Sequence, residues 1–215
     1  MSPVYKLSAN SVKNGRTVYG SMLAGNTAFV ASSFESIATV TVGSGGSSTI
    51  DFTNIPQTFQ HLQIRYIARG QNSPYAWDDG NVRLGGSGGI DTGSNYSFHR
   101  FMGFKYATNN INVDGAANQT SMTVGVAAGS GASADIFGCT IIDILDYSNS
   151  NKYTTIRGIY GVETNSTGTQ THGYNGISSG SWRNTAAVTD IRIFFGGGNA
   201  QQYSHFALYG IKAAA

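Results

Sequence analysis

The sequence predicts an all-β fold: an antiparallel two-sheet sandwich, jelly-roll-like, that carries an extended N-terminal arm. Gly, Ser, Thr and Asn make up 90 of the 215 residues, and charged residues are 11% of the chain. Such a mixture favours strands and turns over long helices. Several segments alternate apolar with polar residues, as a half-buried strand does. Aromatic residues, 12% of the chain, supply enough apolar bulk for a packed core.

Residues 1–33 are expected to form the arm, and residues 34–215 a single sandwich domain. The arm segment is interrupted by glycines and has no apolar period, so that it has little to bury by itself. It contains basic but no acidic residues, and its apolar side chains would suit docking against a neighbouring subunit. We therefore predict that it attaches the chain to a neighbouring subunit through Lys13, Arg16, Val18, Tyr19, Met22 and Leu23.

The first strands of the domain are predicted from apolar alternation. Residues 34–42 share an apolar face, the segment GSGGSS interrupts them, and residues 50–52 resume the pattern, which predicts a hairpin. In residues 62–69, Leu, Ile, Tyr and Ala alternate with Gln and Arg. This second pattern predicts a half-buried strand with a polar outer face.

The middle of the chain gives weaker signals. Residues 71–93 are rich in Gly and Asp and predict a long loop, with a short strand at 81–84 as an option. Residues 95–104, NYSFHRFMGF, suit a strand or a short helix equally well. Residues 116–134 are small and Gly-rich, and they predict a second loop.

The strongest strand signal is residues 136–147, IFGCTIIDILDY, which are apolar on both faces and predict a central strand. Residues 153–160 follow a short Asn-Ser turn, so we expect an antiparallel hairpin with that strand. Residues 191–195 and 205–211 bring the total to about eight strands. Cys139, the only cysteine, is expected to be a small buried core residue.

Composition and motifs exclude several classes of partner and cofactor. The net charge of +2 is small and the bases are scattered, so no nucleic acid is expected. No apolar run approaches the roughly 20 residues that span a bilayer, and the start lacks the apolar region of a signal peptide, which predicts a product made in the cytosol without membrane binding. No metal or other cofactor is expected, because His and Cys do not occur at metal-ligand spacing and phosphate-binding and hydrolase motifs are absent.

The segment around residues 74–79 is the best candidate for recognition. Exposed rings can stack on the apolar face of a sugar, and nearby carboxylates accept its hydroxyl hydrogens. A second Gly-rich segment at residues 182–183 offers another indole and a guanidinium. The candidate ligand-binding residues are therefore Tyr75, Trp77, Asp78, Asp79, Trp182 and Arg183.

Other interpretations of these residues remain open at this point. The two indoles would also suit a structural role, closing the ends of the sandwich. A Ca²⁺ site on Asp78, Asp79 and Asp91 is a weaker option, because the spacing of a known calcium loop is absent. Glycoside hydrolysis needs two carboxylates across a sugar, but Asp143 is expected to be satisfied within its strand. We therefore expect no enzymatic activity.

Four phrases of the sequence carry a resemblance to a known class of proteins. They are FESIATVTVGSGGSSTIDFTNIPQTFQHLQIRYIAR, NYSFHRFMG, IIDILDYSNSNKYTTIRGIYG and TDIRIFFGGGNAQQYSHFALYGIK. This succession resembles a module of virion structural proteins of tailed bacteriophages, especially those that infect cyanobacteria and other aquatic bacteria. The likeness runs from about Phe34 to Lys212 and includes no catalytic signature.

The resemblance implies a virion component: a head decoration protein, a tail fibre or a tail-tip adhesin. We expect a non-enzymatic surface structural protein of the virion, either a head decoration protein or a short tail component, that the arm attaches to other capsid or tail proteins. The alternative is a tail fibre or tail-tip adhesin that binds a host surface glycan. Open sheet edges and virion symmetry favour a homo-oligomer, with a trimer expected.

Overall fold

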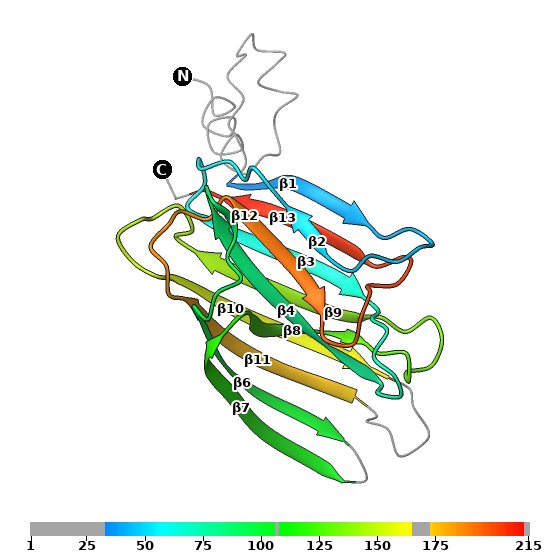
Figure 1. The fold of residues 1–215 in the computed structure, drawn as a ribbon. Helices are drawn as coiled ribbons and strands as arrows, with labels where there is room; N and C mark the ends of the chain where they lie inside the picture. The colour runs from blue at the N-terminus through cyan, green and yellow to red at the C-terminus, as the bar shows by residue number, and fades with distance from the viewer. Residues whose placement is uncertain (1–32, 106–107, 165–172, 213–215) are drawn as a thin grey trace, which may run out of the picture.

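The computed structural model describes residues 33–105, 108–164 and 173–212, and every regular element in them is a β-strand (Figure 1). The strands form two antiparallel sheets, which confirms the predicted all-β sandwich. The described ranges contain thirteen strands rather than about eight. No helix in them has the length and apolar character needed to cross a membrane. The predicted arm lies outside the described residues except for Ser33.

The larger sheet has eight strands, and each neighbouring pair is antiparallel. Its order across the sheet is β1 (Phe34–Thr41), β13 (His205–Ile211), β3 (His61–Ala68), β9 (Gly138–Leu145), β10 (Thr154–Glu163), β11 (Gly173–Trp182), β6 (Tyr96–Lys105) and β7 (Asn109–Gln119).

The smaller sheet is built around one long strand, β4 (Trp77–Gly86). One edge of β4 pairs with β12, and the other edge pairs with β5 and β8. The remaining strands of this sheet are β2 (Ile50–Phe52), which pairs with β12 (Asp190–Phe195), and β5 (Gly89–Ile90) and β8 (Met122–Ala128).

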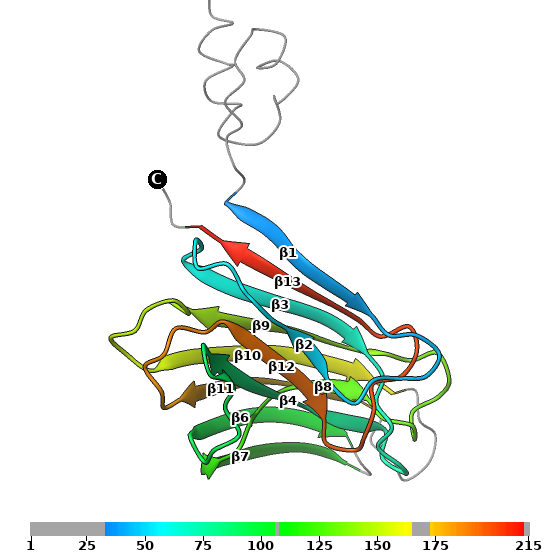
Figure 2. The same cartoon turned by 45° about the horizontal axis from the view of Figure 1, so that its top comes forward.

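The smaller sheet lies across one face of the larger sheet, as the two views in Figures 1 and 2 show. We call this covered face the inner face and the opposite one the outer face. Inner-face residues of β3 such as Leu62 and Ile64 pack with Ile191 and Ile193 of β12 in the main core cluster. Burial alternates along β3, β9 and β10 because successive side chains of a strand point to opposite faces.

The close packing of β8 on β10 depends on a glycine. A β-carbon at Gly158 of β10 would overlap the carbonyl oxygen of Val124 in β8. The same oxygen accepts a hydrogen bond from the hydroxyl of Ser178 in the adjacent strand, at 3.1 Å. Glycine therefore lets the backbone of β8 lie directly on the inner face of the larger sheet.

Several sequence predictions of local structure are wrong. Residues 34–42 and 50–52 form no hairpin, because β1 pairs with β13 of the larger sheet and β2 pairs with β12 of the smaller one. The predicted loop at 71–93 contains β4 and β5, and the predicted loop at 116–134 contains β8. Gly80, Gly85 and Gly125 lie where a strand has close neighbours, whereas Gly88 and Gly131 lie in turns.

Other predictions hold. The half-buried strand at 62–69 is β3, the central strand is β9, and its antiparallel partner is β10. The ambiguous segment at 95–104 is a strand, β6. Cys139 is exposed on the outer face of β9, however, so its predicted burial is wrong: a strand that is apolar on both sides does not reveal which side is covered. The jelly-roll description stays a prediction.

We predict that Gly158→Ala destabilises the protein by about 1–3 kcal/mol, because the methyl group forces β8 away from β10. The matched control is Gly161→Ala in the same strand, where the nearest atom to a new β-carbon is 3.8 Å away. Urea unfolding of both variants measures the difference. Equal midpoints for the two variants would show that the contact between β8 and β10 is not this close.

Candidate functional site

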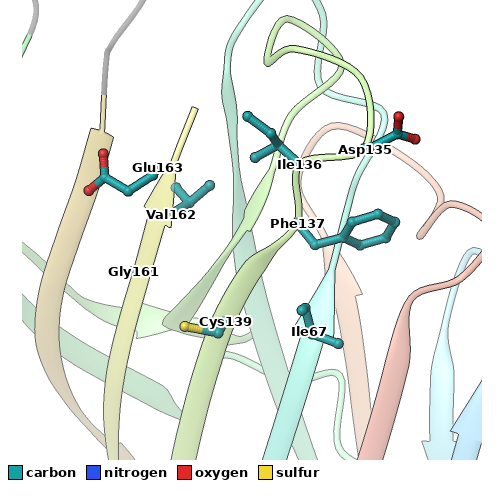
Figure 3. A pocket seen from close by; sticks show the side chains of 8 residues that line it. All are labelled: Ile67, Asp135, Ile136, Phe137, Cys139, Gly161, Val162 and Glu163. Carbon is teal, nitrogen blue, oxygen red and sulfur yellow. The ribbon is translucent and has the colours of Figure 1, made fainter. Parts of the chain in front are cut away.

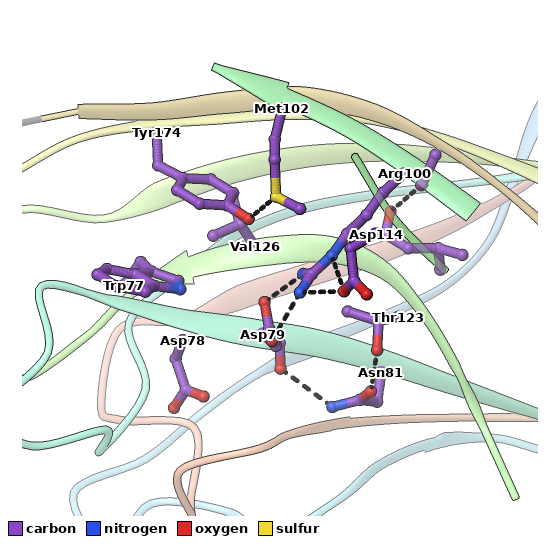
Figure 4. Close-up of polar contacts among 12 residues, drawn as sticks. Trp77, Asp78, Asp79, Asn81, Arg100, Met102, Asp114, Thr123, Val126 and Tyr174 are labelled. Atoms are coloured by element: carbon purple, nitrogen blue, oxygen red, sulfur yellow. Dashed lines mark hydrogen bonds and ion pairs between the residues drawn. The ribbon is translucent and has the colours of Figure 1, made fainter. Parts of the chain in front are cut away.

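Residues 77–79 of the predicted recognition segment lie in strand β4 rather than in a loop, and residues 74–76 precede that strand. Trp77 and Asp79 lie on the face of β4 that looks toward β11 and β6, whereas Asp78 lies on the opposite face (Figure 4). This separation follows from the two-residue period of a strand. The structure therefore keeps Trp77 and Asp79 together and assigns Asp78 to a different environment.

An aromatic stack runs from solvent into the sandwich at this end of β4. Tyr75 is 49% exposed, and its ring centroid lies 5.4 Å from that of Trp77. Trp77 stacks on Tyr174 of β11 at 5.7 Å, and Tyr174 stacks on Phe104 of β6 at 5.9 Å. We call Tyr75, Trp77, Tyr174 and Phe104 the aromatic stack; its outer ring is open to solvent.

The inner end of the stack belongs to a small second core. Tyr174 is buried, which raises the pKa of its hydroxyl, and this hydroxyl donates a hydrogen bond to the sulfur of Met102. Tyr160, also buried, stacks on Tyr174 at 6.2 Å. Burial raises the pKa of Tyr160 to about 12. Both tyrosines thus stay neutral in the physiological range and act mainly as packing groups.

Beside the stack, Arg100 of β6 ties the two sheets together (Figure 4). Its guanidinium contacts the Asp79 carboxylate of β4 at 2.6 Å and the Asp114 carboxylate of β7 at 2.9 Å. The Arg100 side chain is 13% exposed. Burial alone lowers its pKa, but the charges and hydrogen bonds of the two carboxylates together raise it above the usual value. Asp79 is therefore engaged inside the protein, although the sequence suggested a ligand contact.

Asp78 is fully buried on the other face of β4. Its carboxylate accepts hydrogen bonds from the backbone N–H groups of Gly197, at 2.8 Å, and Asn72, at 3.2 Å. Burial raises the pKa of Asp78 to about 6, and the two hydrogen bonds offset part of that effect. The carboxyl group joins two loops beside β4, and a β-carbon at Gly70 would overlap it.

Trp182 and Arg183 lie at the far end of β11 from Tyr174. Trp182 is eight positions further along the strand than Tyr174, which corresponds to roughly 26 Å. Trp182 is 1% exposed, and its indole N–H donates to Asp91 at 2.8 Å. Arg183 donates to the carbonyl oxygen of Ser94 and to the side chain of Asn118. The structure does not bring this pair to the aromatic stack.

The acidic residues considered for metal binding or hydrolysis are likewise dispersed. Asp91 is at the Trp182 end, and Asp143 lies on the outer face, where it accepts from Gln63 and pairs with Arg157. Across the described ranges, no three His, Cys, Asp or Glu side chains gather in a way that could hold a metal ion. Asp143 is thus satisfied within the sheet, as the sequence indicated.

The outer face carries an apolar surface that sequence reasoning missed. Strand register places large apolar side chains directly opposite one another on five adjacent strands, β9, β10, β11, β6 and β7. Two more isoleucines flank this row, and all seven side chains are 40–74% exposed. We call these residues the apolar belt: Ile141, Ile159, Ile177, Phe101 and Val113 in the row, and Ile67 and Ile111 beside it.

A shallow hollow of about 620 Å³ adjoins the belt at the ends of β3, β9 and β10 (Figure 3). Ile67, Cys139 and Gly161 form its floor, and Ile136 and Phe137 border it from the segment before β9. The carboxylates of Asp135 and Glu163 complete the lining. Gly161 lies between Cys139 and Asn175 on the neighbouring strands. Because glycine has no side chain, the surface is lower at this position.

Comparison with known proteins gives only distant likenesses. No family model and no curated protein matches the chain. An alginate lyase from Aplysia kurodai has a TM-score of 0.34 at 8% identity over 82% of this chain and 82% of its own. The enzymatically active domain of tailspike protein 2 from bacteriophage CBA120 has 0.30 at 13% identity, over 85% of this chain and 29% of its own.

A carbohydrate-binding module of the Dit protein from Lactobacillus casei BL23 phage J-1 reaches a TM-score of 0.12 at 8% identity, over 78% of this chain and 70% of its own. Phage proteins are thus among the weak structural neighbours, together with carbohydrate-active enzymes. At these scores none of the likenesses carries an argument about function.

We predict that Asp78 makes the protein less stable as pH rises from about 4 to about 6. In this window the unfolded chain releases the Asp78 proton while the folded chain retains it, so folding loses on the order of 3 kcal/mol from this group. Urea unfolding of the wild type and Asp78→Asn across this range isolates the effect from other carboxylates. A stability difference between the two proteins that stays constant with pH would contradict it.

Proposed function

We propose that this chain is a non-enzymatic structural protein on the surface of a tailed-phage virion. The phrases quoted from its sequence support the virion setting. The apolar belt is the structural observation that supports assembly, because its area is at the upper end of what soluble monomers expose and patches of this size are often contact surfaces. A particle component has neighbours that cover such a surface.

The proposed attachment to a particle concerns the N-terminal side of the chain. The described part starts at Ser33, immediately before β1, and β1 is an edge strand of the larger sheet (Figure 1). We propose that residues 1–33 attach the protein to capsid or tail proteins, and that the basic residues Lys13 and Arg16 contact acidic partners. The sandwich then faces solvent.

The first experiment is mass spectrometry of purified particles of the phage that encodes this chain, with and without residues 1–33. We expect the full chain at a fixed copy number and loss of incorporation on deletion, while circular dichroism of the truncated protein still shows β structure. A full-length chain that is absent from the particles contradicts the proposed function. Incorporation of the truncated chain at the wild-type copy number contradicts the role of the arm alone.

A second candidate function is glycan binding, and the aromatic stack is the observation that favours it. Tyr75 presents an exposed ring and Trp77 a half-buried one, and the carboxylates of Asp79 and Asp114, although paired with Arg100, remain 34% and 43% exposed beside them. Rings with adjacent hydrogen-bonding groups suit the two faces of a sugar. Because Arg100 already pairs with both carboxylates, this arrangement suits binding better than proton transfer to a substrate.

A glycan array tests this candidate directly. If the stack binds sugars, Tyr75→Ala and Trp77→Ala lower the affinity for the bound glycan about tenfold or more, since each removes a stacking surface. Tyr153→Ala is the control, because Tyr153 is 53% exposed but lies outside the stack. If both stack variants still bind the glycan, or if the wild type binds no glycan, the stack is not a glycan site and only the structural function remains.

A further inference from the structure

We propose that the apolar belt is an interface with a second copy of this chain, packed outer face to outer face about a two-fold axis. The inference deepens the proposed function and rests on it, because it names the partner that covers the belt. It concerns the outer face of β9, β10, β11, β6 and β7, whose row of apolar side chains is continuous across the strands.

The size of the belt fits a pair of copies. Its seven large side chains are about half exposed on average, which leaves on the order of 600 Å² of apolar surface. The largest apolar patch of a typical soluble monomer is roughly 300–600 Å². A specific interface needs about 800 Å² from each partner, including its polar rim. The belt and its neighbours therefore supply nearly the area that one partner of a stable pair contributes.

The register of the sheet indicates where the axis lies. An axis parallel to the strands and midway between β10 and β11 exchanges these two strands between the copies. Ile159 of one copy then faces Ile177 of the second copy, and Ile141 faces its Phe101. Sheets packed in this way lie about 10 Å apart with interdigitating side chains. The contact is closest near the axis, where strand twist separates the two sheets least.

The row of residues next to the central row of the belt, which ends in the belt residues Ile67 and Ile111, is complementary about the same axis. It reads Ile67, Cys139, Gly161, Asn175, Gly103 and Ile111 from β3 to β7. The two-fold axis places small residues of one copy opposite larger residues of the second copy: Gly161 faces Asn175, and Gly103 faces Cys139. Ile111, the most exposed belt residue at 74%, comes over Ile67 at the floor of the hollow. Each such contact occurs twice, as in an isologous interface.

The polar row on the other side of the belt agrees with this axis. It places Asp143 opposite His99 of the second copy and Arg157 opposite Ser179, so that like charges do not meet there. An axis perpendicular to the strands would instead set Arg157 against Gly161 and Asp143 against Cys139. Polar groups would then be buried against the apolar flank, which is costly. We therefore infer the axis parallel to the strands.

Sedimentation equilibrium of the full-length protein tests the interface. We expect a concentration-dependent dimer in place of the trimer that the sequence suggested, since a two-fold contact closes on two copies. We expect Ile159→Lys and Ile177→Lys each to weaken self-association about tenfold or more, because each buries a charge at the centre of the contact. Tyr153→Lys is the matched control: it replaces an equally exposed ring outside the belt and leaves association unchanged. A wild-type monomer at all concentrations, or an oligomer that both belt variants leave intact, overturns the proposal.

Disulfide cross-linking provides a second test of the interface if a lysine variant fails to fold. In a Cys139→Ser background, Ile159→Cys and Ile177→Cys proteins are oxidised separately and then as a mixture. We expect the mixture to form the disulfide-linked dimer faster, because residue 159 faces residue 177 across the axis. No gain on mixing overturns this geometry. Neither outcome bears on whether the chain is found in phage particles, so failure of the interface and failure of the proposed function are distinguishable.

Discussion

The eight-stranded sheet carries large apolar side chains on both faces, and the described chain covers only one of them. On the inner face, residues such as Leu62 and Ile156 are fully buried beneath the smaller sheet. On the outer face, Ile159 and Ile177 are more than half exposed although they lie at the centre of the sheet. An exposed apolar sheet face costs free energy in water until another surface covers it. This asymmetry connects the fold to the proposed assembly.

The inner side of the sandwich is occupied by contacts that hold the layers together. Gly158 lets the backbone of β8 approach β10, and Arg100 joins β4 to β6 and β7 through two carboxylates. Asp78 joins the loops beside β4 through backbone hydrogen bonds. Polar groups that the sequence suggested as ligand contacts thus have partners within the protein. In the described part of the chain, the outer face and the exposed end of the aromatic stack are surfaces open to other molecules.

Sequence patterns predicted the strands whose apolar period is regular, such as β3 and β12, because alternation is a local property. They missed β4 and β8, because these strands contain glycines and glycine-rich sequences usually predict turns. In the structure, several of these glycines allow segments that are distant in the sequence to pack closely. The hairpin at residues 34–52 failed because a Gly-Ser segment can equally pass from one sheet to the other. Trp77 and Trp182 looked alike as isolated indoles, and only the tertiary structure separates the half-buried one from the core residue.

The belt was beyond sequence reasoning for a related reason. Each strand contributes only one or two outward apolar residues, and the continuous row appears only when five strands are placed in register. The most direct measurement is an experimental structure of the assembled protein, by crystallography or electron cryo-microscopy. We predict that Ile159 of one copy lies in van der Waals contact with Ile177 of another. Outer faces of β10 and β11 that are open to solvent in the assembly would contradict this.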